Sequence, residues 1–194
     1  AAQVMTFTNR ADWEAAVGRS YVLENFNSSA VQTIADGATL DTGLLQVTRN
    51  GAANGGDGDL EIRDGSSFGN IDGTNFLFGE TGVEPHESVE FGFNGSDVFA
   101  FGADFVSPYS GDGIDIVAGG TRYSLSGIGS GAGFFGLVEM SGASLGAISY
   151  DGTLDPITFQ ELWQSDNVSY AQVPAPAGLA VLGLGALVAT RRRR

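Results

Sequence analysis

The residue types that most often carry out covalent catalysis are scarce in this sequence. It contains no cysteine and no lysine, and its single histidine, His86, stands between Pro85 and Glu87. One serine motif is present, because residues 65–69 read Gly-Ser-Ser-Phe-Gly and match the Gly-x-Ser-x-Gly pattern of a nucleophile elbow. That elbow needs a strand, a sharp turn and a helix, whereas glycine and aspartate surround this motif and no helical pattern follows it. We therefore predict loops at residues 65–69 and at His86, and no acyl-transfer site.

Carboxylates and tyrosines are the remaining candidates for chemistry. The chain has 23 acidic residues, but no pair of them falls in a recognisable glycosidase frame. Residues 55–59, Gly-Gly-Asp-Gly-Asp, are similar to the calcium-binding nonapeptide of β-roll proteins. They occur once, without the repetition that those sites need, and Leu60 follows them. A flexible acidic loop is the favoured interpretation, and we expect a protein that is not an enzyme.

The charge of the chain restricts its partners. The formal net charge is −14, and all nine basic residues are arginines. Four of these are the last four residues, so the preceding chain has five arginines against 23 acidic residues, a net charge near −18. Such a body is repelled by nucleic acid and by anionic lipid, and we expect neither as a partner. Two explanations of the negative charge remain open. It could keep the protein soluble in a crowded or salty exterior, or it could bind divalent cations.

One short helix is predicted near the amino terminus, over residues 9–18. Asn9 is placed to cap the free amides, and Gly18 supplies a left-handed stop. Trp13 and Val17 are four residues apart and therefore lie on one face, which we expect to pack on a sheet.

The rest of the body, up to residue 172, has the period of two that is typical of strands. Turns are expected at Asn94-Gly95 and at Gly119-Gly120, and the glycine-, asparagine- and aspartate-rich stretch 50–73 predicts a long loop with a short strand inside it. The sequence thus predicts an all-β fold, an antiparallel β-sandwich of jelly-roll type. The strand candidates are 21–26, 44–49, 60–63, 75–78, 88–93, 99–105, 114–117, 122–125, 134–140, 145–150 and 168–170.

Residues 173–194 differ from everything before them. The segment from Ala177 to Thr190 carries no charge, and four basic residues follow it, namely Arg191, Arg192, Arg193 and Arg194. As a helix, 14 residues span roughly 21 Å, somewhat less than the hydrocarbon core of a bilayer. The arginines would hold their end in the cytoplasm and leave the body outside. A buried core helix is the other interpretation, but it leaves the arginine cluster unexplained.

The tail resembles the PEP-CTERM sorting signal of Gram-negative bacteria, which is a Pro-Glu-Pro-like motif, a short glycine-containing apolar helix and a basic cluster. The motif corresponds here to Val173, Pro174, Ala175 and Pro176, with Ala175 in the place of the usual glutamate. The resemblance implies recognition by an exosortase in the inner membrane, release of the body to the cell surface, and association with exopolysaccharide and biofilm matrix. It also implies export, and the start at Ala1-Ala2-Gln3 is compatible with a signal peptide that has already been removed.

The body is similar to the β-rich domains that often precede such tails. The similar pieces are residues 7–13, 23–26, 98–105, 134–137 and 165–170. The resemblance implies a jelly roll whose first and last strands lie side by side. In jelly rolls similar to carbohydrate-binding and MAM domains, an acid on the first strand and the aspartate of a closing Asp-Asn-Val share a structural calcium ion, which here implies Glu24 and Asp166 as ligands. A simple turn at Asp166-Asn167 is the alternative.

Together these observations predict an exported, non-enzymatic surface or matrix protein. Its expected partners are the exosortase, the inner membrane through the tail, and extracellular polysaccharide. The alternative is a carbohydrate-binding module with a defined glycan site, and an enzyme acting on polysaccharide comes third. A row of exposed aromatic side chains, or a tight acid pair in a cleft, would distinguish them.

Overall fold

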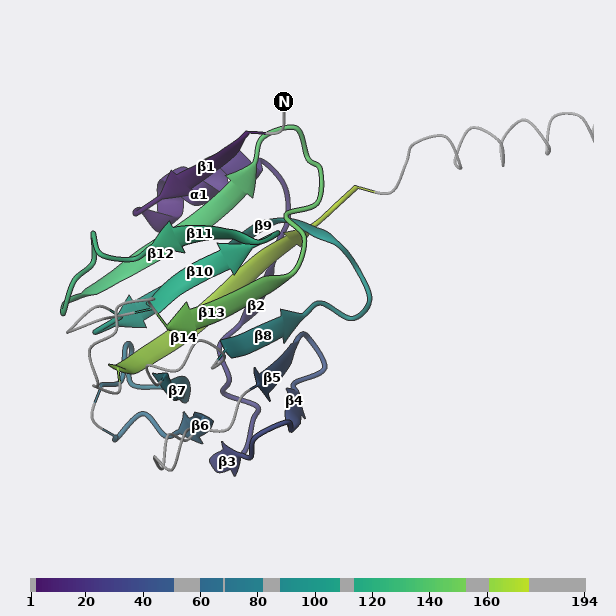
Figure 1. The fold of residues 1–194 in the computed structure, drawn as a ribbon. Helices are drawn as coiled ribbons and strands as arrows, with labels where there is room; N and C mark the ends of the chain where they lie inside the picture. Colours follow the sequence, from purple (N-terminus) through teal and green to yellow (C-terminus); the bar gives the residue numbers. More distant parts are fainter. Residues whose placement is uncertain are drawn as a thin grey trace, which may run out of the picture.

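The computed structural model describes residues 3–50, 60–67, 69–81, 88–108, 114–152 and 161–174. These residues form two β-sheets in which every pairing is antiparallel, and one short helix (Figure 1). The elements are β1 (Val4–Phe7), α1 (Arg10–Val17), β2 (Val22–Glu24), β3 (Gln32–Ile34), β4 (Thr39–Asp41), β5 (Gln46–Asn50), β6 (Leu60–Arg63), β7 (Phe76–Thr81), β8 (Ser88–Gly92), β9 (Val98–Val106), β10 (Ile114–Ala118), β11 (Thr121–Ser124), β12 (Ala132–Glu139), β13 (Ile148–Gly152) and β14 (Glu161–Gln172).

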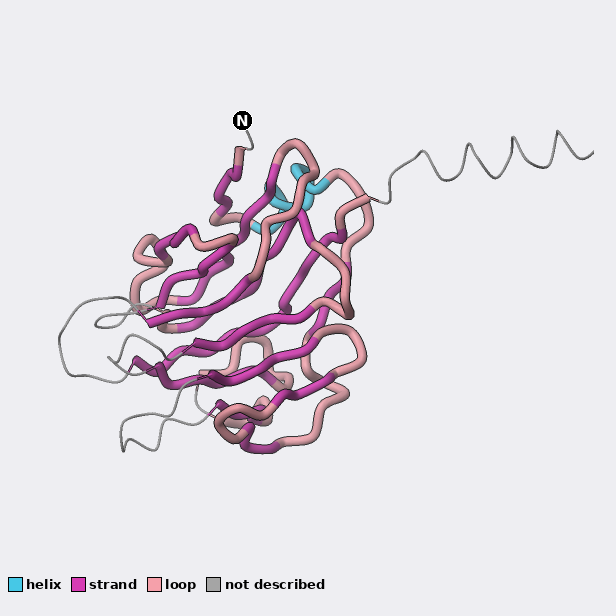
Figure 2. Tube along the Cα trace, turned by 45° about the vertical axis from the view of Figure 1, so that its right-hand side comes forward, coloured by secondary structure: helices cyan, strands magenta, loops and turns pink. Residues whose placement is uncertain are grey.

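The eight-stranded sheet has the order β1-β12-β9-β14-β7-β6-β3, and β2 pairs with β14 beside this path. The six-stranded sheet has the order β11-β10-β13-β8-β5-β4. Figure 2 shows the strands in two layers, with the helix at one end of the molecule. The expected all-β, antiparallel two-sheet sandwich with a short N-terminal helix is therefore confirmed.

The main core lies between the two sheets and is rich in aromatic side chains. Tyr150 of the six-stranded sheet is fully buried, and its ring packs against Phe105 and Trp163 of the eight-stranded sheet, with centroids 5.3 Å apart in both pairs. We call the face of each sheet that contributes to this core its inner face. Because strand side chains alternate, the neighbouring residues point to the outer face.

Helix α1 covers part of the outer face of the eight-stranded sheet, as the sequence predicts. The side chain of Asn9 accepts a hydrogen bond from the Asp12 amide at 3.2 Å, and Gly18 adopts φ +63°. Trp13 and Val17 are buried in a second apolar cluster, where the Trp13 indole N–H donates to the Leu137 carbonyl at 3.1 Å. Within the part of the chain that the structure describes, no helix has the length and apolar character needed to cross a membrane.

Both predicted turns are present, but only one of them connects two strands of the same sheet. Gly119 and Gly120 have φ +56° and +80° and connect β10 to β11 in a tight hairpin. Asn94 and Gly95 have φ +52° and +74°, yet β8 and β9 belong to different sheets. The second turn therefore carries the chain from one sheet to the other.

The strand predictions differ from the structure mainly at the edges and at the end. The short strands β1, β3 and β4 were not predicted, and β14 extends over residues 161–172, far beyond the predicted 168–170. The predicted strand at 145–150 is displaced, because β13 begins only at Ile148. The strand that carries Glu24, β2, does lie beside the last strand, whereas β1 pairs with β12 at the sheet edge.

Candidate functional site

Strand β14 contains an irregularity at Asn167. This residue has φ +52°, and the register with β9 shifts between Asp166 and Ser169. Such a β-bulge changes the direction of the side chains around it. Before the bulge, Ser165 points inward to the Tyr150 hydroxyl and Asp166 points outward; after it, Val168 is part of the core. The Asp-Asn pair is thus a bulge inside a long strand.

The bulge brings three aspartates together on the outer face of the eight-stranded sheet. Asp104 lies directly opposite Asp166 on β9, and Asp72 comes from the loop between β6 and β7. The Asn167 side-chain amide donates to Asp104 Oδ2 at 3.1 Å and reaches Asp72 Oδ2 at 3.5 Å. The Thr74 hydroxyl donates to Asp72 Oδ1 and lies 3.4 Å from Asp166 Oδ2. We call Asp72, Asp104 and Asp166 the aspartate cluster.

Arg10 supplies the cation next to this cluster. Its Nη2 atom lies 3.0 Å from Asp104 Oδ2 and donates to the Asn167 carbonyl at 3.0 Å. Its Nη1 atom donates to Ser169 Oγ at 2.8 Å. The guanidinium also lies 4.6 Å above the centre of the Phe134 ring. One side chain therefore ties helix α1 to β9, β12 and β14.

The environment of Asp166 disfavours its charged form. The residue is 0% exposed, and burial raises its pKa to about 7, although its carboxylate accepts a 2.6 Å hydrogen bond from the Asn167 amide, which opposes the shift. Repulsion from Asp72 and Asp104 contributes further to the rise. In contrast, the hydrogen bond from the Thr74 hydroxyl holds the pKa of Asp72 below its ordinary value. The cluster therefore has one carboxyl group that can gain or lose a proton near neutral pH.

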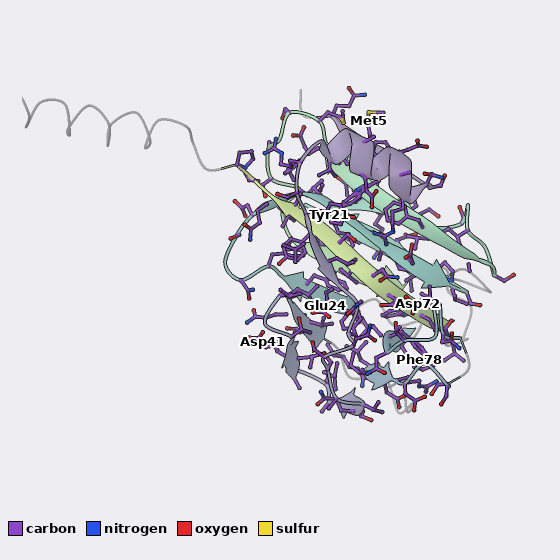
Figure 3. All side chains as sticks on the ribbon, turned by 180° about the vertical axis from the view of Figure 1, so that it is seen from behind. Met5, Tyr21, Glu24, Asp41, Asp72 and Phe78 are labelled. Carbon is purple, nitrogen blue, oxygen red and sulfur yellow. The ribbon has the colours of Figure 1, made fainter. Side chains whose placement is uncertain are left out.

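Glu24, the other residue of the expected calcium pair, lies on the opposite face of the same sheet. It pairs with Val168, whose side chain is part of the core, and it is 2% exposed. Its Oε1 atom accepts the Phe26 amide at 2.6 Å, while its Oε2 atom is buried without a hydrogen-bond partner. Figure 3 shows Glu24 of β2 well apart from Asp72 in the loop between β6 and β7.

The structure therefore does not bring Glu24 and Asp166 together, since the bulge at Asn167 turns Asp166 outward while Glu24 remains inward. Among the residues that the structure describes, no group of three or more His, Cys, Asp or Glu side chains is arranged to hold a metal ion. Calcium binding stays a prediction, and the residues do not fit a single ion shared by these two carboxylates.

A second pair of carboxylates lies on the outer face of the six-stranded sheet. Asp115 and Asp151 are directly opposite each other on β10 and β13. Arg122 bridges them, with N–O distances of 3.4 and 3.3 Å. Burial raises the pKa of Asp115, and Arg122 opposes the rise. Two carboxylates on adjacent strands bridged by one arginine form a cross-strand ion-pair network.

The remaining sequence candidates have structural roles or lie outside the described residues. In the serine motif, Ser66 hydrogen-bonds the Asp64 carboxylate and no helix follows, as expected for a loop. Val173 and Pro174, the first two residues of the predicted sorting motif, directly follow β14. The sequence candidates that lie outside the described residues are Phe68, His86, residues 55–59, Ala175, Pro176, the apolar segment 177–190 and the arginines 191–194.

Sequence reasoning missed Arg10, Asp72, Thr74 and Asp104 as neighbours of Asp166. The bond between Arg10 and the Asn167 carbonyl joins residues 157 positions apart. No local pattern marks such a contact. Comparison with known proteins gives no match to a family model, to a curated protein or to a solved structure.

Proposed function

We propose that this chain is an exported bacterial surface or extracellular-matrix protein, sorted through a PEP-CTERM-like tail at residues 173–194. In this proposal an exosortase recognises the tail in the inner membrane, and residues 1–172 are a non-enzymatic structural or binding body. The tail's uncharged segment and arginine cluster support its role in the membrane.

The observation that carries the proposal is that the folded body ends immediately before the predicted tail. Strand β14 finishes at Gln172, and the Val173 amide donates to the Asp97 carbonyl at 2.9 Å. Pro174 is exposed directly after this bond. Cleavage beyond Pro174 would therefore leave every described strand and every described core residue in place, as release of a stable body requires.

We further assign the sandwich to the jelly-roll type. The support for this assignment is that consecutive strands repeatedly cross between the sheets. The chain passes from β7 in the larger sheet to β8 in the smaller, back to β9 and again to β10, and it repeats this crossing from β12 to β13 to β14. An apolar C-terminal helix over residues 177–190 is the remaining part of the fold proposal.

In this proposal the contacts of Asp72 and Asp104 favour binding over cleavage. The carboxylates of the aspartate cluster are engaged by Asn167, Thr74 and Arg10. The large apolar side chains that are exposed in the described residues are Met, Leu and Val, so no observation favours an aromatic glycan platform. We propose weak association with the producer's own polysaccharide, with calcium bridging carboxylates on both partners.

Fractionation of the producing cells tests the sorting proposal. The full chain should be found in the inner membrane, and a form that lacks Arg191 to Arg194 should be found at or beyond the cell surface. Mass spectrometry of the surface form gives its last residue. An intact Arg194 on the extracellular protein would contradict processing, while a chain without residues 177–194 should fold normally but no longer fractionate with the membrane.

A pull-down with the polysaccharide, with and without chelator, tests the body. We expect calcium-dependent retention and no new reducing ends. Reducing ends that accumulate with the native body, and disappear when a single acid is replaced, would show that the body is an enzyme.

A further inference from the structure

The body holds the chain tightly up to the first residue of the tail. Val173 is half-buried against the apolar cluster under helix α1, and its amide is bonded to Asp97. Only three peptide units separate Pro174 from Ala177, where the uncharged segment begins. Fully extended, they span roughly 10 Å. If the tail enters a bilayer as proposed above, the surface around Pro174 must lie close to the lipid headgroups.

That surface is hollowed, and its lining combines apolar side chains with polar groups. A hollow of about 440 Å³ adjoins Val173 and Pro174 and is lined by Val17, Phe99 and Met140 among others. Met140 is 47% exposed.

A second exposed methionine lies on the neighbouring strand. Met5 of β1 is 41% exposed and stands opposite Val138, while the Met140 amide donates to the Gln3 carbonyl. Met5 and Met140 are therefore diagonal neighbours on the face that α1 partly covers, and Figure 3 shows Met5 beside the helix. We call the two side chains and the hollow the methionine patch.

The charges at the methionine patch suit a neutral lipid surface. Arg19 lines the hollow, with its guanidinium 4.7 Å from the centre of the Phe99 ring. The acidic side chain in the lining, Glu139, is 1% exposed and is already bonded to the Gln3 amide, the Ser141 hydroxyl and the Ala143 amide. No open carboxylate in this lining faces the lipid, whereas the strongly acidic body as a whole disfavours anionic lipid.

We propose that, while the tail is in the membrane, the methionine patch rests in the headgroup region of a zwitterionic bilayer. Met5 and Met140 lie against the acyl boundary, as apolar side chains of interfacial proteins do, and Arg19 faces lipid phosphate. The patch thus holds the body in a fixed orientation with Pro174 next to the membrane. This inference rests on the proposed insertion of the tail.

The absence of cysteine makes a site-specific test possible, because one introduced cysteine can be spin-labelled alone. The full chain is prepared as Met140→Cys and, as matched control, as Leu162→Cys. Leu162 is 46% exposed, so the two positions have the same exposure. It stands ten residues before Gln172 on β14, roughly 33 Å along the strand. Both labelled proteins are reconstituted into phosphatidylcholine nanodiscs.

The measurement is the collision rate of each label with oxygen, which concentrates in bilayers, and with a nickel complex, which stays in water. On reconstitution the oxygen-to-nickel ratio should rise at position 140 and stay unchanged at 162. An unchanged ratio at 140 in protein that has entered the nanodiscs overturns the patch contact but leaves tail insertion intact. Shielding of position 140 from both reagents means that protein covers the patch, which also overturns the lipid contact. Failure of the chain to enter nanodiscs overturns both proposals.

Discussion

Replacement of Asp166 by asparagine tests the electrostatics of the aspartate cluster. Asparagine has nearly the same shape, and its Oδ1 atom can still accept the 2.6 Å hydrogen bond from the Asn167 amide. The change removes only the carboxyl group whose ionisation is disfavoured by burial and by the neighbouring Asp72 and Asp104. We expect the variant to be more stable than the native chain at alkaline pH and equally stable at acidic pH.

The sign and the size of this stability change follow from proton linkage. The pKa of Asp166 is 3.8 in its ordinary state and about 7 in the folded protein. Between these values the folded state holds a proton that the unfolded state has lost, so native stability falls as pH rises through this window and levels off above pH 7. Each pKa unit corresponds to about 1.36 kcal/mol, so the full shift sets a ceiling of about 4 kcal/mol. We expect the variant to gain between about 1 and 4 kcal/mol at pH 8.

Urea unfolding at pH 4, 6 and 8 in the presence of chelator measures this gain, with Asp36→Asn as the control. Asp36 is an exposed residue between β3 and β4, and its replacement changes the net charge by the same amount. A gain at pH 8 in both variants would reflect net charge alone. A loss of stability at pH 8 in Asp166→Asn would refute the argument, because it would mean that the buried carboxylate is stabilised by its surroundings.

Calcium binding at Asp166 would offset part or all of the gain expected for Asp166→Asn. A ligand that binds only the folded state at 100 times its Kd adds about 2.7 kcal/mol. If a cation binds at Asp166, calcium should raise the melting temperature of the native chain and leave Asp166→Asn unchanged. An identical melting temperature of the native chain in calcium and in chelator would show that calcium does not bind the folded protein.

Four further substitutions test the packing and the polar contacts of the described residues. In Gly79→Ala the new Cβ would lie 2.1 Å from Trp163 Cζ2, so the variant should lose more than about 2 kcal/mol in urea unfolding, whereas Gly127→Ala, where space is open, should change stability by less than about 0.5 kcal/mol. Trp13→Phe should lose about 1–3 kcal/mol, because the Leu137 carbonyl loses its donor, and an unchanged urea midpoint would show that the bond contributes nothing. Arg10→Lys keeps the charge but not the forked geometry that reaches Asp104 and Ser169 at once. It should speed amide hydrogen exchange in α1, and native exchange rates would contradict the anchoring role of Arg10.

Some parts of the fold could be predicted because they depend on neighbours in sequence. Helix α1 begins after Asn9 and stops at Gly18, where the cap bonds span three or four residues. The Gly119-Gly120 hairpin needs only two residues that accept positive φ. The alternating apolar pattern of residues 88–105 likewise gave β8 and β9 correctly, since strand alternation does not depend on the identity of the partner strand.

The sheet to which each strand belongs, and the site, depended on the tertiary structure. Nothing local distinguishes a turn that closes a hairpin from the Asn94-Gly95 turn, which joins the two sheets. The polar run at residues 164–167 conceals most of β14, because Ser165, Asp166 and Asn167 interact with side chains far away in the sequence and add nothing to an apolar pattern.

The aspartate cluster shows the same dependence most clearly. Sequence singled out Asp166, but Asp104 and Asp72 are connected to it through Asn167, which lies 63 and 95 residues away from them. A bulge reverses which face each following side chain occupies, and one such reversal separates Asp166 from Glu24. Periodicity determines that residues alternate, but only the pairing of distant strands determines which side of the sheet each carboxylate faces.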